Sequence, residues 1–350
     1  MSMFYIVSNH FDATLSLKHN RPDEVSFTDT RYSLSRTRLL AVLLLIAQGV
    51  LVCSDARAEN WAIVVGINDY PEFRLPDGAQ PPALRGAETD ADAIARRLVE
   101  DFAFPEAHVV LLKGRRATHS RVKQAFEDVA RQARATDLFV FHFSGHGTRV
   151  ADRKPFDEPD GVDEALCLAD ATDKQENLLV DDDLALWLDA IPARRITIIL
   201  DCCHAGTGIK GSDDDIAARY LPIPESAGTR LAEPEIAWRE LRGVTKDIGR
   251  QLTAFYACKA EQQAYERRFP HLPAPARAGQ FTQAMLAGLE KNAADADGDG
   301  KVTSAELLRF AALRLDETFN KLRDRPDERQ EPLLESDDAE ALPFGTINKK

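Results

Sequence analysis

The chain is 350 residues long, 44% of them hydrophobic, and it carries a formal net charge of −13. This length and composition suffice for the buried core of one large globular domain or two small ones. The excess of acidic residues argues against a nucleic-acid partner and against a stable partner in an anionic membrane. The negative net charge is compatible with a basic substrate or partner, and an ordinary solvated acidic surface explains it equally well.

The first 58 residues are typical of a secretory signal with a long leading segment. The apolar run 39–52 follows two arginines and leads into Ala56-Arg57-Ala58, an Ala-x-Ala cleavage pattern. Cleavage after Ala58 would make Glu59 the first residue of an exported protein, periplasmic or secreted. The run is short for a membrane span, so an uncleaved membrane anchor is the second choice.

From residue 59 onward, apolar strands alternate with amphipathic helices. Strands are predicted at 61–68, 108–112, 138–143, 163–169, 196–200 and 252–258. Helices are predicted at 84–102, 118–133, 182–190, 281–291 and 304–320. Repeated βα units with apolar strands favour an α/β fold, a largely parallel central sheet with helices on both faces. We expect one domain over 59–345, made of a region 59–206, a linker 207–250 and a region 251–345.

Two of the predicted strands run directly into reactive residues. Strand 138–143 leads into Ser144-Gly145-His146-Gly147, and strand 196–200 leads into Asp201-Cys202-Cys203-His204. The ends of neighbouring parallel strands lie about 4.8 Å apart at one edge of a sheet. His146 would then be close enough to serve as the base for a cysteine nucleophile.

The cysteine count leaves a structural alternative open. Cys53 leaves with the signal, and an even number of cysteines remains: Cys167, Cys202, Cys203 and Cys258. In an oxidising compartment these can form two disulfides, although a chain of this length is able to bury a core without them. A bond between the adjacent Cys202 and Cys203 would be strained. We therefore expect Cys202 to face the other side and pack as a small apolar residue.

The alternation is interrupted between Gly206 and Arg250 by Gly, Pro, Ser and charged residues. A long irregular loop in a compact domain is usually functional or disordered, and we expect 207–250 to be an exposed linker. Its basic residues are Lys210, Arg219, Arg230, Arg239, Arg242, Lys246 and Arg250. Basic residues are ordinary in an exposed loop, so their presence alone establishes nothing.

Residues 295–306 have the spacing of an EF-hand calcium loop, with Gly300 at the sharp turn. The side-chain ligands would be Asp295, Asp297, Asp299, Thr303 and Glu306, with the carbonyl of Lys301 as a further ligand. Hard oxygen ligands at this spacing suit Ca²⁺, and a helix is predicted on each side. EF-hands usually work in pairs, so an Asp/Gly turn that binds no ion is the alternative.

The order of these motifs resembles that of the caspase-like cysteine peptidases, in particular the metacaspase branch. His-Phe-Ser-Gly-His-Gly at 142–147 and Asp-Cys-Cys-His-Ala-Gly at 201–206 resemble the histidine and cysteine motifs of that family. Further matches begin at Trp61, Leu84, Asp160 and Leu179. The chain departs from these family motifs at four positions. Ala87 replaces cysteine, Thr89 replaces asparagine, Leu168 replaces proline, and Ala169 differs from the residues that end its motif.

The resemblance implies a caspase-like sandwich and a cysteine endopeptidase with a His146/Cys203 dyad. It also implies that the backbone N–H groups of Gly147 and Cys203 stabilise the oxyanion. Nothing in the sequence requires a third member of the catalytic group.

The resemblance places Asp90, Ser144 and Asp201 around the pocket for the substrate residue that precedes the cut. Two carboxylates in a partly desolvated pocket require a cation and repel an acidic side chain, so cleavage is expected after Arg or Lys. The alternative is that Asp90 only caps its helix and Asp201 only ends its strand.

Metacaspase resemblance further implies self-cleavage in the linker and calcium activation at a separate acidic site. Asp170, Asp181 and Asp182 match three acids of that site, whereas Lys210 stands where the fourth is expected. We expect a monomer that acts on protein or peptide substrates. Two rivals stay open: a catalytically silent calcium-binding interaction protein on this scaffold, and a different cysteine hydrolase of the same fold family.

Overall fold

The computed structural model describes residues 58–152, 161–204, 216–223, 250–260, 262–273, 276–322 and 328–346. The chain divides into two compact units, 1–56 and 57–350, and all described residues belong to the second. The predicted signal therefore lies outside the described residues, apart from Ala58. Within the described part, no helix combines the length and the apolar character needed to cross a membrane.

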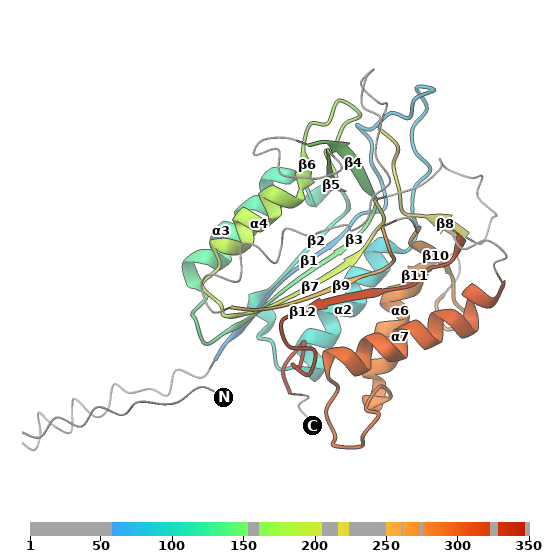
Figure 1. The fold of residues 1–350 in the computed structure, drawn as a ribbon. Helices are drawn as coiled ribbons and strands as arrows, with labels where there is room; N and C mark the ends of the chain where they lie inside the picture. Colours follow the sequence, from blue (N-terminus) through green and yellow to red (C-terminus); the bar gives the residue numbers. More distant parts are fainter. Residues whose placement is uncertain are drawn as a thin grey trace, which may run out of the picture. The chain divides into compact units, whose positions relative to one another are not determined.

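A six-stranded sheet forms the centre of the second unit, in the order β12-β9-β7-β3-β1-β2 (Figure 1). Its strands are β1 (Asn60–Gly66), β2 (Val109–Lys113), β3 (Leu138–Ser144), β7 (Arg195–Asp201), β9 (Gln251–Tyr256) and β12 (Leu333–Ser336). Neighbouring strands are parallel except at one edge, where β12 pairs antiparallel with β9. The predicted largely parallel sheet is confirmed.

Helices cover both faces of this sheet (Figure 1). One face carries α3 (His119–Gln132) and α4 (Asp181–Asp189), and the other carries α2 (Ala87–Asp101), α6 (Gln280–Leu289) and α7 (Ser304–Thr318). In β3, Phe139, Phe141 and Phe143 pack in the core beneath α3 and α4. Leu138 and Val140, which alternate with them, pack in the core beneath α2, α6 and α7. Burial on both faces explains why the central strands are continuous apolar runs.

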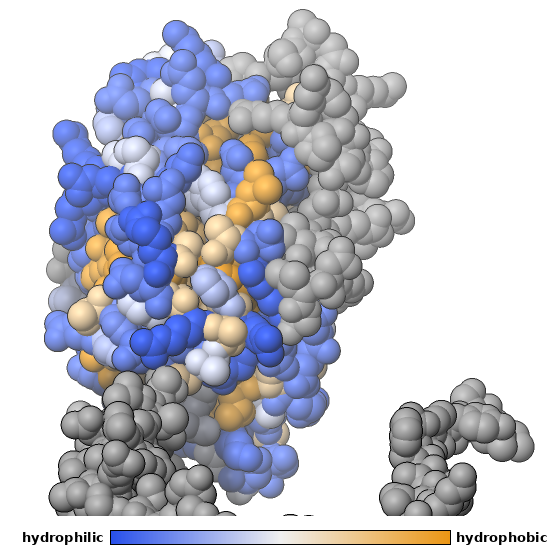
Figure 2. All heavy atoms as spheres, turned by 90° about the vertical axis from the view of Figure 1, so that its left-hand side faces the viewer, coloured by the Kyte–Doolittle hydropathy of each residue, from blue (hydrophilic) through white to orange (hydrophobic). Residues whose placement is uncertain are grey.

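The face with α3 and α4 is largely hydrophilic where the structure describes it, with apolar groups in patches (Figure 2). Leu186 of α4 is 67% exposed. Single exposed leucines are common in soluble domains, so this residue does not mark a site.

The main differences from the predicted elements concern short strands. The sequence did not predict a sheet made of β4 (Gly147–Ala151), β5 (Val162–Cys167) and β6 (Leu178–Val180), of which only β5 was expected as a strand. It also missed a second small sheet of β11 (Arg277–Gly279), β10 (Tyr265–Arg268) and β8 (Ile216–Ala218). Segments of three to six residues carry little periodic signal.

The strand β8 corrects the expectation that 207–250 is an exposed linker. Residues 216–223 of this segment are described, and within them Arg219 and Leu221 are fully buried. β8 is held by antiparallel pairing with β10. The expectation of exposure is therefore wrong for 216–223, while nearly all the rest of the segment lies outside the described residues.

Candidate active site

The predicted reactive residues gather where β3 and β7 end. In the parallel register Ser144 of β3 faces Asp201 of β7, and the Gly145 N–H donates to the Asp201 carbonyl at 3.4 Å. The segments that carry His146 and Cys203 therefore leave the sheet at the same edge. This geometry agrees with the expected placement of sites beyond the carboxyl ends of parallel strands.

The two adjacent cysteines face opposite sides of the sheet. Cys203 packs in the core with α2, α6 and α7, whereas Cys202 packs in the core with α3 and α4. The Sγ of Cys202 lies 3.4 Å from Nε2 of His204. Cys167, Cys202, Cys203 and Cys258 are all buried, and none of them forms a disulfide within the described residues. Thus the predicted packing role of Cys202 fits the structure, and the disulfide alternative does not.

His146 is held by its backbone and is only 3% exposed. Its N–H donates to the hydroxyl of Tyr70 at 2.8 Å, and the two rings lie 5.0 Å apart. Neither ring nitrogen has a hydrogen-bond partner among the described residues. Burial, reinforced by the charge of Arg219, lowers the pKa of His146 to about 3. The imidazole is therefore neutral at pH 7 and able to accept a proton. Sequence reasoning missed the supporting role of Tyr70.

The thiol of Cys203 is protonated in this form of the protein, because burial raises its pKa to about 12. Proton transfer from Cys203 to His146 is strongly uphill while both groups stay desolvated. Burial thus favours the neutral thiol of Cys203 and the neutral imidazole of His146.

The backbone N–H groups predicted to form the oxyanion site converge on one carbonyl oxygen. The N–H of Gly147 donates to the Arg219 carbonyl at 3.0 Å, and the N–H of Cys203 donates to the same oxygen at 3.3 Å. A Cβ at residue 147 would collide with the Cys203 carbonyl and approach the His204 ring within 2.8 Å. Glycine is needed here for close packing of the two loops.

The guanidinium of Arg219 fills the pocket that the sequence assigned to a basic side chain. Its Nη2 lies 2.7 Å from Oδ2 of Asp90, and its Nη1 lies 3.0 Å from Oδ1 of Asp201. The same Nη1 donates to the Ser144 hydroxyl at 2.8 Å, and Ser144 donates to Asp90 at 2.9 Å. All three predicted pocket residues are therefore in contact with this one arginine.

A third carboxylate, Glu266 of β10, completes the pocket and was not found from the sequence. Its Oε2 lies 3.6 Å from Nη2 of Arg219. It also accepts hydrogen bonds from the N–H groups of Arg85 and Gly86, at 2.8 and 2.9 Å. Its position depends on β10, a short strand that periodicity does not reveal, so no local signal identified it.

The pocket wall is closed by the start of α6. The N–H of Gly279 donates to both carboxylate oxygens of Asp90 at 3.0 Å. Thr282 donates to Asp201 from its N–H at 3.1 Å and from its hydroxyl at 2.6 Å. A Cβ at residue 279 would collide with Asp201 and the guanidinium, so the wall needs glycine.

The charges of this pocket depend on one another. Burial raises the pKa of Asp90 to about 7, while the guanidinium of Arg219 opposes that rise. Burial alone would lower the pKa of Arg219, but Asp201, Asp90 and Glu266 outweigh it and raise that pKa. The guanidinium of Arg219 and the carboxylates around it therefore compensate one another's charge in a buried site.

The chain on both sides of Arg219 is extended through the site. Before it, β8 pairs with β10, and the N–H of Arg219 donates to the Ala264 carbonyl at 3.0 Å. After it, the Leu221 N–H donates to the Gly147 carbonyl at 3.0 Å, and Thr148 donates to the Leu221 carbonyl at 2.7 Å. Recognition of a peptide as an added strand has this pattern of main-chain bonds with side chains in pockets.

The predicted calcium loop brings three carboxylates together. Ligand atoms of Asp295, Asp297 and Asp299 lie within 4.8 Å of one another. Glu306 folds back on the loop, accepting from the N–H of Ala296 at 2.8 Å and of Thr303 at 2.9 Å. These bonds lower the pKa of Glu306, so its carboxylate is ionised at neutral pH.

The loop backbone also suits an ion, because Gly298 and Gly300 adopt φ of 78° and 85°. The helix before the loop ends early: α6 stops at Leu289, and Lys291 and Asn292 turn the chain with positive φ. The oxygen donor set nevertheless fits Ca²⁺, with the Lys301 carbonyl and Thr303 as the further predicted ligands.

The second predicted calcium site is not assembled in the same way. Within the described residues, the carboxylates of Asp170, Asp181 and Asp182 do not converge to the spacing seen in the loop. Asp170 instead accepts from the N–H of His119, the first residue of α3, at 2.8 Å. This second site stays a prediction.

Known proteins are similar to this chain in sequence and in fold. The family model described as Caspase domain matches residues 59–341. Metacaspase-4 of Arabidopsis thaliana is 32% identical over 161 residues, which cover 44% of this chain and 35% of that protein. Metacaspase-1 of Pyricularia oryzae is 27% identical over 292 residues, which cover 77% of this chain and 68% of that protein.

A crystal structure from Geobacter sulfurreducens has the same fold, with a TM-score of 0.54 at 23% identity, over 83% of this chain and 100% of the other. The chain spans only about a third of the length of the two Arabidopsis relatives Metacaspase-4 and Metacaspase-6, 35% and 36%.

Proposed function

Because this chain belongs to the caspase-domain family of cysteine peptidases, we propose that it is an endopeptidase that cleaves proteins after arginine or lysine. Its own linker is the first proposed substrate, and Ca²⁺ is the proposed activator. His146 and Cys203 are the proposed catalytic pair.

The observation that carries this proposal is the position of Arg219. Its side chain is fully buried among three carboxylates, and its carbonyl oxygen is held by the N–H groups of Gly147 and Cys203. A substrate residue before a cut needs both contacts at once, one for recognition and one for the oxyanion. The peptide bond between Arg219 and Tyr220 is therefore the proposed site of self-cleavage.

Arginine fits this pocket better than lysine. The two terminal nitrogens of Arg219 reach different acids, Asp90 through Nη2 and Asp201 through Nη1. A lysine presents a single ammonium group and cannot span both carboxylates with the same planar geometry. We therefore expect both residues to be accepted and arginine to be preferred.

The proposed reaction uses the groups already described. Cys203 gives its proton to His146, and its sulfur attacks the carbonyl carbon of the residue in the acidic pocket. The N–H groups of Gly147 and Cys203 bind the negative oxygen. The C–N bond then breaks, and His146 returns the proton to the leaving amine. Water next attacks the thioester, giving its proton to His146, and releases the carboxylic acid and the thiol.

Calcium is proposed to bind Asp295, Asp297, Asp299, the Lys301 carbonyl, Thr303 and Glu306. The support is the convergence of three carboxylates and the return of Glu306 to the loop. Burial favours the neutral forms of His146 and Cys203, which gives a reason for an activator that eases proton transfer between them. The site of Asp170, Asp181 and Asp182 is a second candidate for that role.

Export is proposed from the sequence alone, on the Ala-x-Ala pattern that ends at Ala58. An uncleaved anchor remains the alternative. N-terminal sequencing of the protein from cell fractions distinguishes them, because export predicts a chain that starts at or near Glu59.

Cleavage of two peptides that differ at one residue tests the proposed specificity. Ile-Ala-Ala-Arg-Tyr-Leu copies residues 216–221, and its partner has Asp in place of Arg. We expect kcat/KM for the Arg peptide to be higher by at least about 100-fold, because like charges in a desolvated site cost several kcal/mol. The Cys203→Ala chain gives the background rate. Preference for the Asp peptide would refute the pocket assignment.

A further inference from the structure

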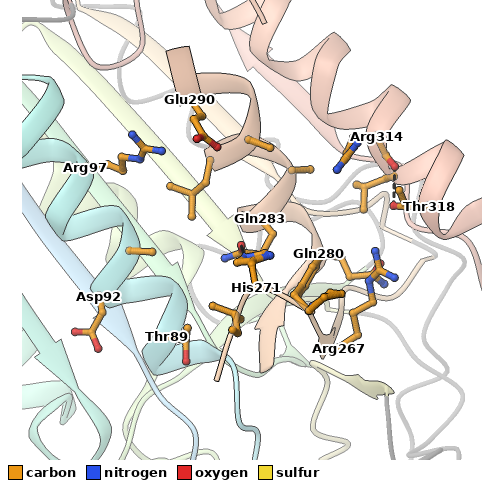
Figure 3. A pocket seen from close by; sticks show the side chains of 18 of the residues that line it. Thr89, Asp92, Arg97, Arg267, His271, Gln280, Gln283, Glu290, Arg314 and Thr318 are labelled. Atoms are coloured by element: carbon orange, nitrogen blue, oxygen red, sulfur yellow. Dashed lines mark hydrogen bonds between the residues drawn. The ribbon is translucent and has the colours of Figure 1, made fainter. Parts of the chain in front are cut away.

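A cavity of about 840 Å³ lies between α2, α6, α7 and residues 267–272, and Cys203 does not line it (Figure 3). Its charged lining consists of Arg96, Arg97, Arg267, Arg314, Asp92 and Glu290. Two of these are already paired with residues outside the lining, Arg97 with Asp101 at 2.6 Å and Asp92 with Lys113 at 2.7 Å. The remaining lining charges are mainly positive.

The end of the cavity near α7 holds two arginines whose charges are not compensated. Among the described residues, no carboxylate forms an ion pair with Arg267 or Arg314. Arg267 stacks over the Phe269 ring at 4.7 Å, and its Nε is buried without a hydrogen-bond partner. Burial and the nearby charge of Arg314 lower the pKa of Arg267. An anion placed between the two guanidinium groups would relieve this repulsion.

Gln280, the first residue of α6, adds a second unsatisfied polar group to the same wall. Its side chain is only 2% exposed, and neither Nε2 nor Oε1 has a hydrogen-bond partner in the described part of the chain. Buried amides without partners are rare and usually face a ligand or water. Figure 3 shows Gln280 on the side of the cavity where Arg267 and Arg314 lie, away from Asp92 on α2.

Arg267, which lines this end of the cavity, belongs to β10, the strand that pairs with β8 in the active site. In the antiparallel register Ala218 faces Tyr265 and Ile216 faces Arg267. A peptide that extends towards its N-terminus from the cut therefore runs along β10 and reaches Arg267 at Ile216. Residues directly opposite in a strand pair point to the same face, so Ile216 and Arg267 share a face.

The chain's own sequence complements this positive charge. Asp213-Asp214-Asp215 stands immediately before Ile216. We propose that the cavity is a subsite for acidic side chains of peptide substrates, located just before the four residues that fill β8 and the arginine pocket. This inference rests on the proposed function, which sets the direction in which the peptide binds. It adds a preference for acidic residues ahead of the cut, which the arginine pocket alone does not impose.

Paired peptides test the subsite kinetically in the calcium-activated, self-processed enzyme. One is Asp-Asp-Asp-Ile-Ala-Ala-Arg-Tyr-Leu and the other has three Asn residues in place of Asp. We expect kcat/KM to be about fivefold to tenfold higher for the acidic peptide, mainly through KM, since partly exposed charge pairs contribute modestly to binding. Raising the salt concentration should reduce that ratio.

Matched variants locate the effect. Arg314→Gln, an exposed position on α7, should reduce the ratio towards one while leaving kcat for the Asn peptide unchanged. Arg267→Gln should reduce the same ratio. Arg309→Gln, on the same helix but outside the cavity lining, should preserve it. Equal kcat/KM for the two peptides in the unmodified enzyme overturns the inference, and so does a ratio that survives both substitutions.

A measurement without catalysis separates this inference from the proposed function. In the full-length Cys203→Ala chain, Asp213, Asp214 and Asp215 are changed together to Asn, alone and combined with Arg314→Gln. The inference predicts that each change lowers Tm and that the combined change lowers it no further than the larger single effect. Additive Tm shifts, or no Tm shift, overturn the inference even if neither peptide is cleaved. Stabilisation by inorganic phosphate that needs Arg314 but not the aspartates would instead assign the site to a free anion.

Discussion

A buried arginine destabilises a folded chain unless its charge is compensated. Arg219 is compensated by Asp90, Asp201 and Glu266 and by the hydroxyl of Ser144. This arrangement would be an unusual way to stabilise a core, because replacing a buried ion pair with apolar residues is often neutral or stabilising. The arrangement does suit a linker segment whose arginine occupies the pocket that we propose for a basic substrate side chain.

The neighbouring cysteines should respond differently to substitution. Cys203→Ala should abolish self-cleavage and peptide cleavage, because it removes the thiol of the proposed nucleophile while keeping the N–H that binds the Arg219 carbonyl. His146→Ala should do the same by removing the base. Cys202→Ala should reduce kcat/KM by less than about tenfold, because its thiol packs on the opposite face of the sheet and only a small apolar volume is lost. Activity that survives Cys203→Ala but not Cys202→Ala would reverse the assignment.

Asp90 should set the pH dependence of self-cleavage. With its pKa raised to about 7, it gains a proton as the pH falls through that value and no longer balances the Arg219 charge. The rate of self-cleavage should therefore rise with pH through about 7, since the pKa values of His146 and Cys203 lie near 3 and 12. The folding contribution has the opposite sign: the proton on Asp90 favours the folded chain at low pH, and this contribution is lost as the pH rises through about 7.

Asp90→Asn provides the control for this pH profile. It keeps the shape and most hydrogen bonds, but it removes the charge and with it the inflection near pH 7. The rate at pH 8 should fall by about 10 to 100-fold, the loss expected for one charge-assisted hydrogen bond. Gel densitometry that follows the loss of the intact chain from pH 5 to 9 measures both the inflection and the rate at pH 8. An unchanged inflection in the variant would show that another group titrates.

At the scale of elements, the loop 295–306 can be tested apart from the catalytic groups. Glu306→Gln keeps the capping geometry at the start of α7 but removes the charge of the proposed bidentate ligand. Calcium affinity should fall by at least about tenfold. In metal sites generally, even the loss of a group that only hydrogen-bonds to a ligand lowers metal affinity by that much. Titration calorimetry of the Cys203→Ala chain measures it, with Glu290→Gln, just outside the loop, as the matched control. Equal affinity in both variants would exclude this loop as the calcium site.

The elements that the sequence predicted are those with strong periodicity or a continuous apolar run. β3 and β7 were found because they are buried on both faces, and their ends placed Ser144, His146, Asp201 and Cys203 at one edge of the sheet. β8 and β10 were not found, because they are short and stabilised by pairing with each other rather than by local preference. Glu266 was missed for this reason, and Arg219 could not be distinguished from the other basic residues of the linker.

At the scale of the whole molecule, the chain on each side of the linker contributes strands to the central sheet. The chain before Arg219 supplies β1, β2, β3 and β7, and the chain after it supplies β9 and β12. β7 and β9 are central neighbours, paired from Arg195 with Gln251 to Leu200 with Tyr256. The core beneath α2, α6 and α7 likewise contains residues from both parts, such as Ile94 and Phe281. Cutting the bond after Arg219 would leave all of these contacts in place.

Self-cleavage should therefore give two chains that stay together. Mass spectrometry after calcium addition should find one new C-terminus at Arg219 and one new N-terminus at Tyr220. On native gel filtration both chains should elute together at the position of the uncut protein, because a buried parallel strand pair and a shared core do not separate without unfolding. In denaturant they should separate. Arg219→Gln should prevent this cut, since a neutral amide cannot balance three buried carboxylates. Two chains that elute apart under native conditions would contradict the shared core, and a first cut elsewhere in the linker would contradict the placement of Arg219.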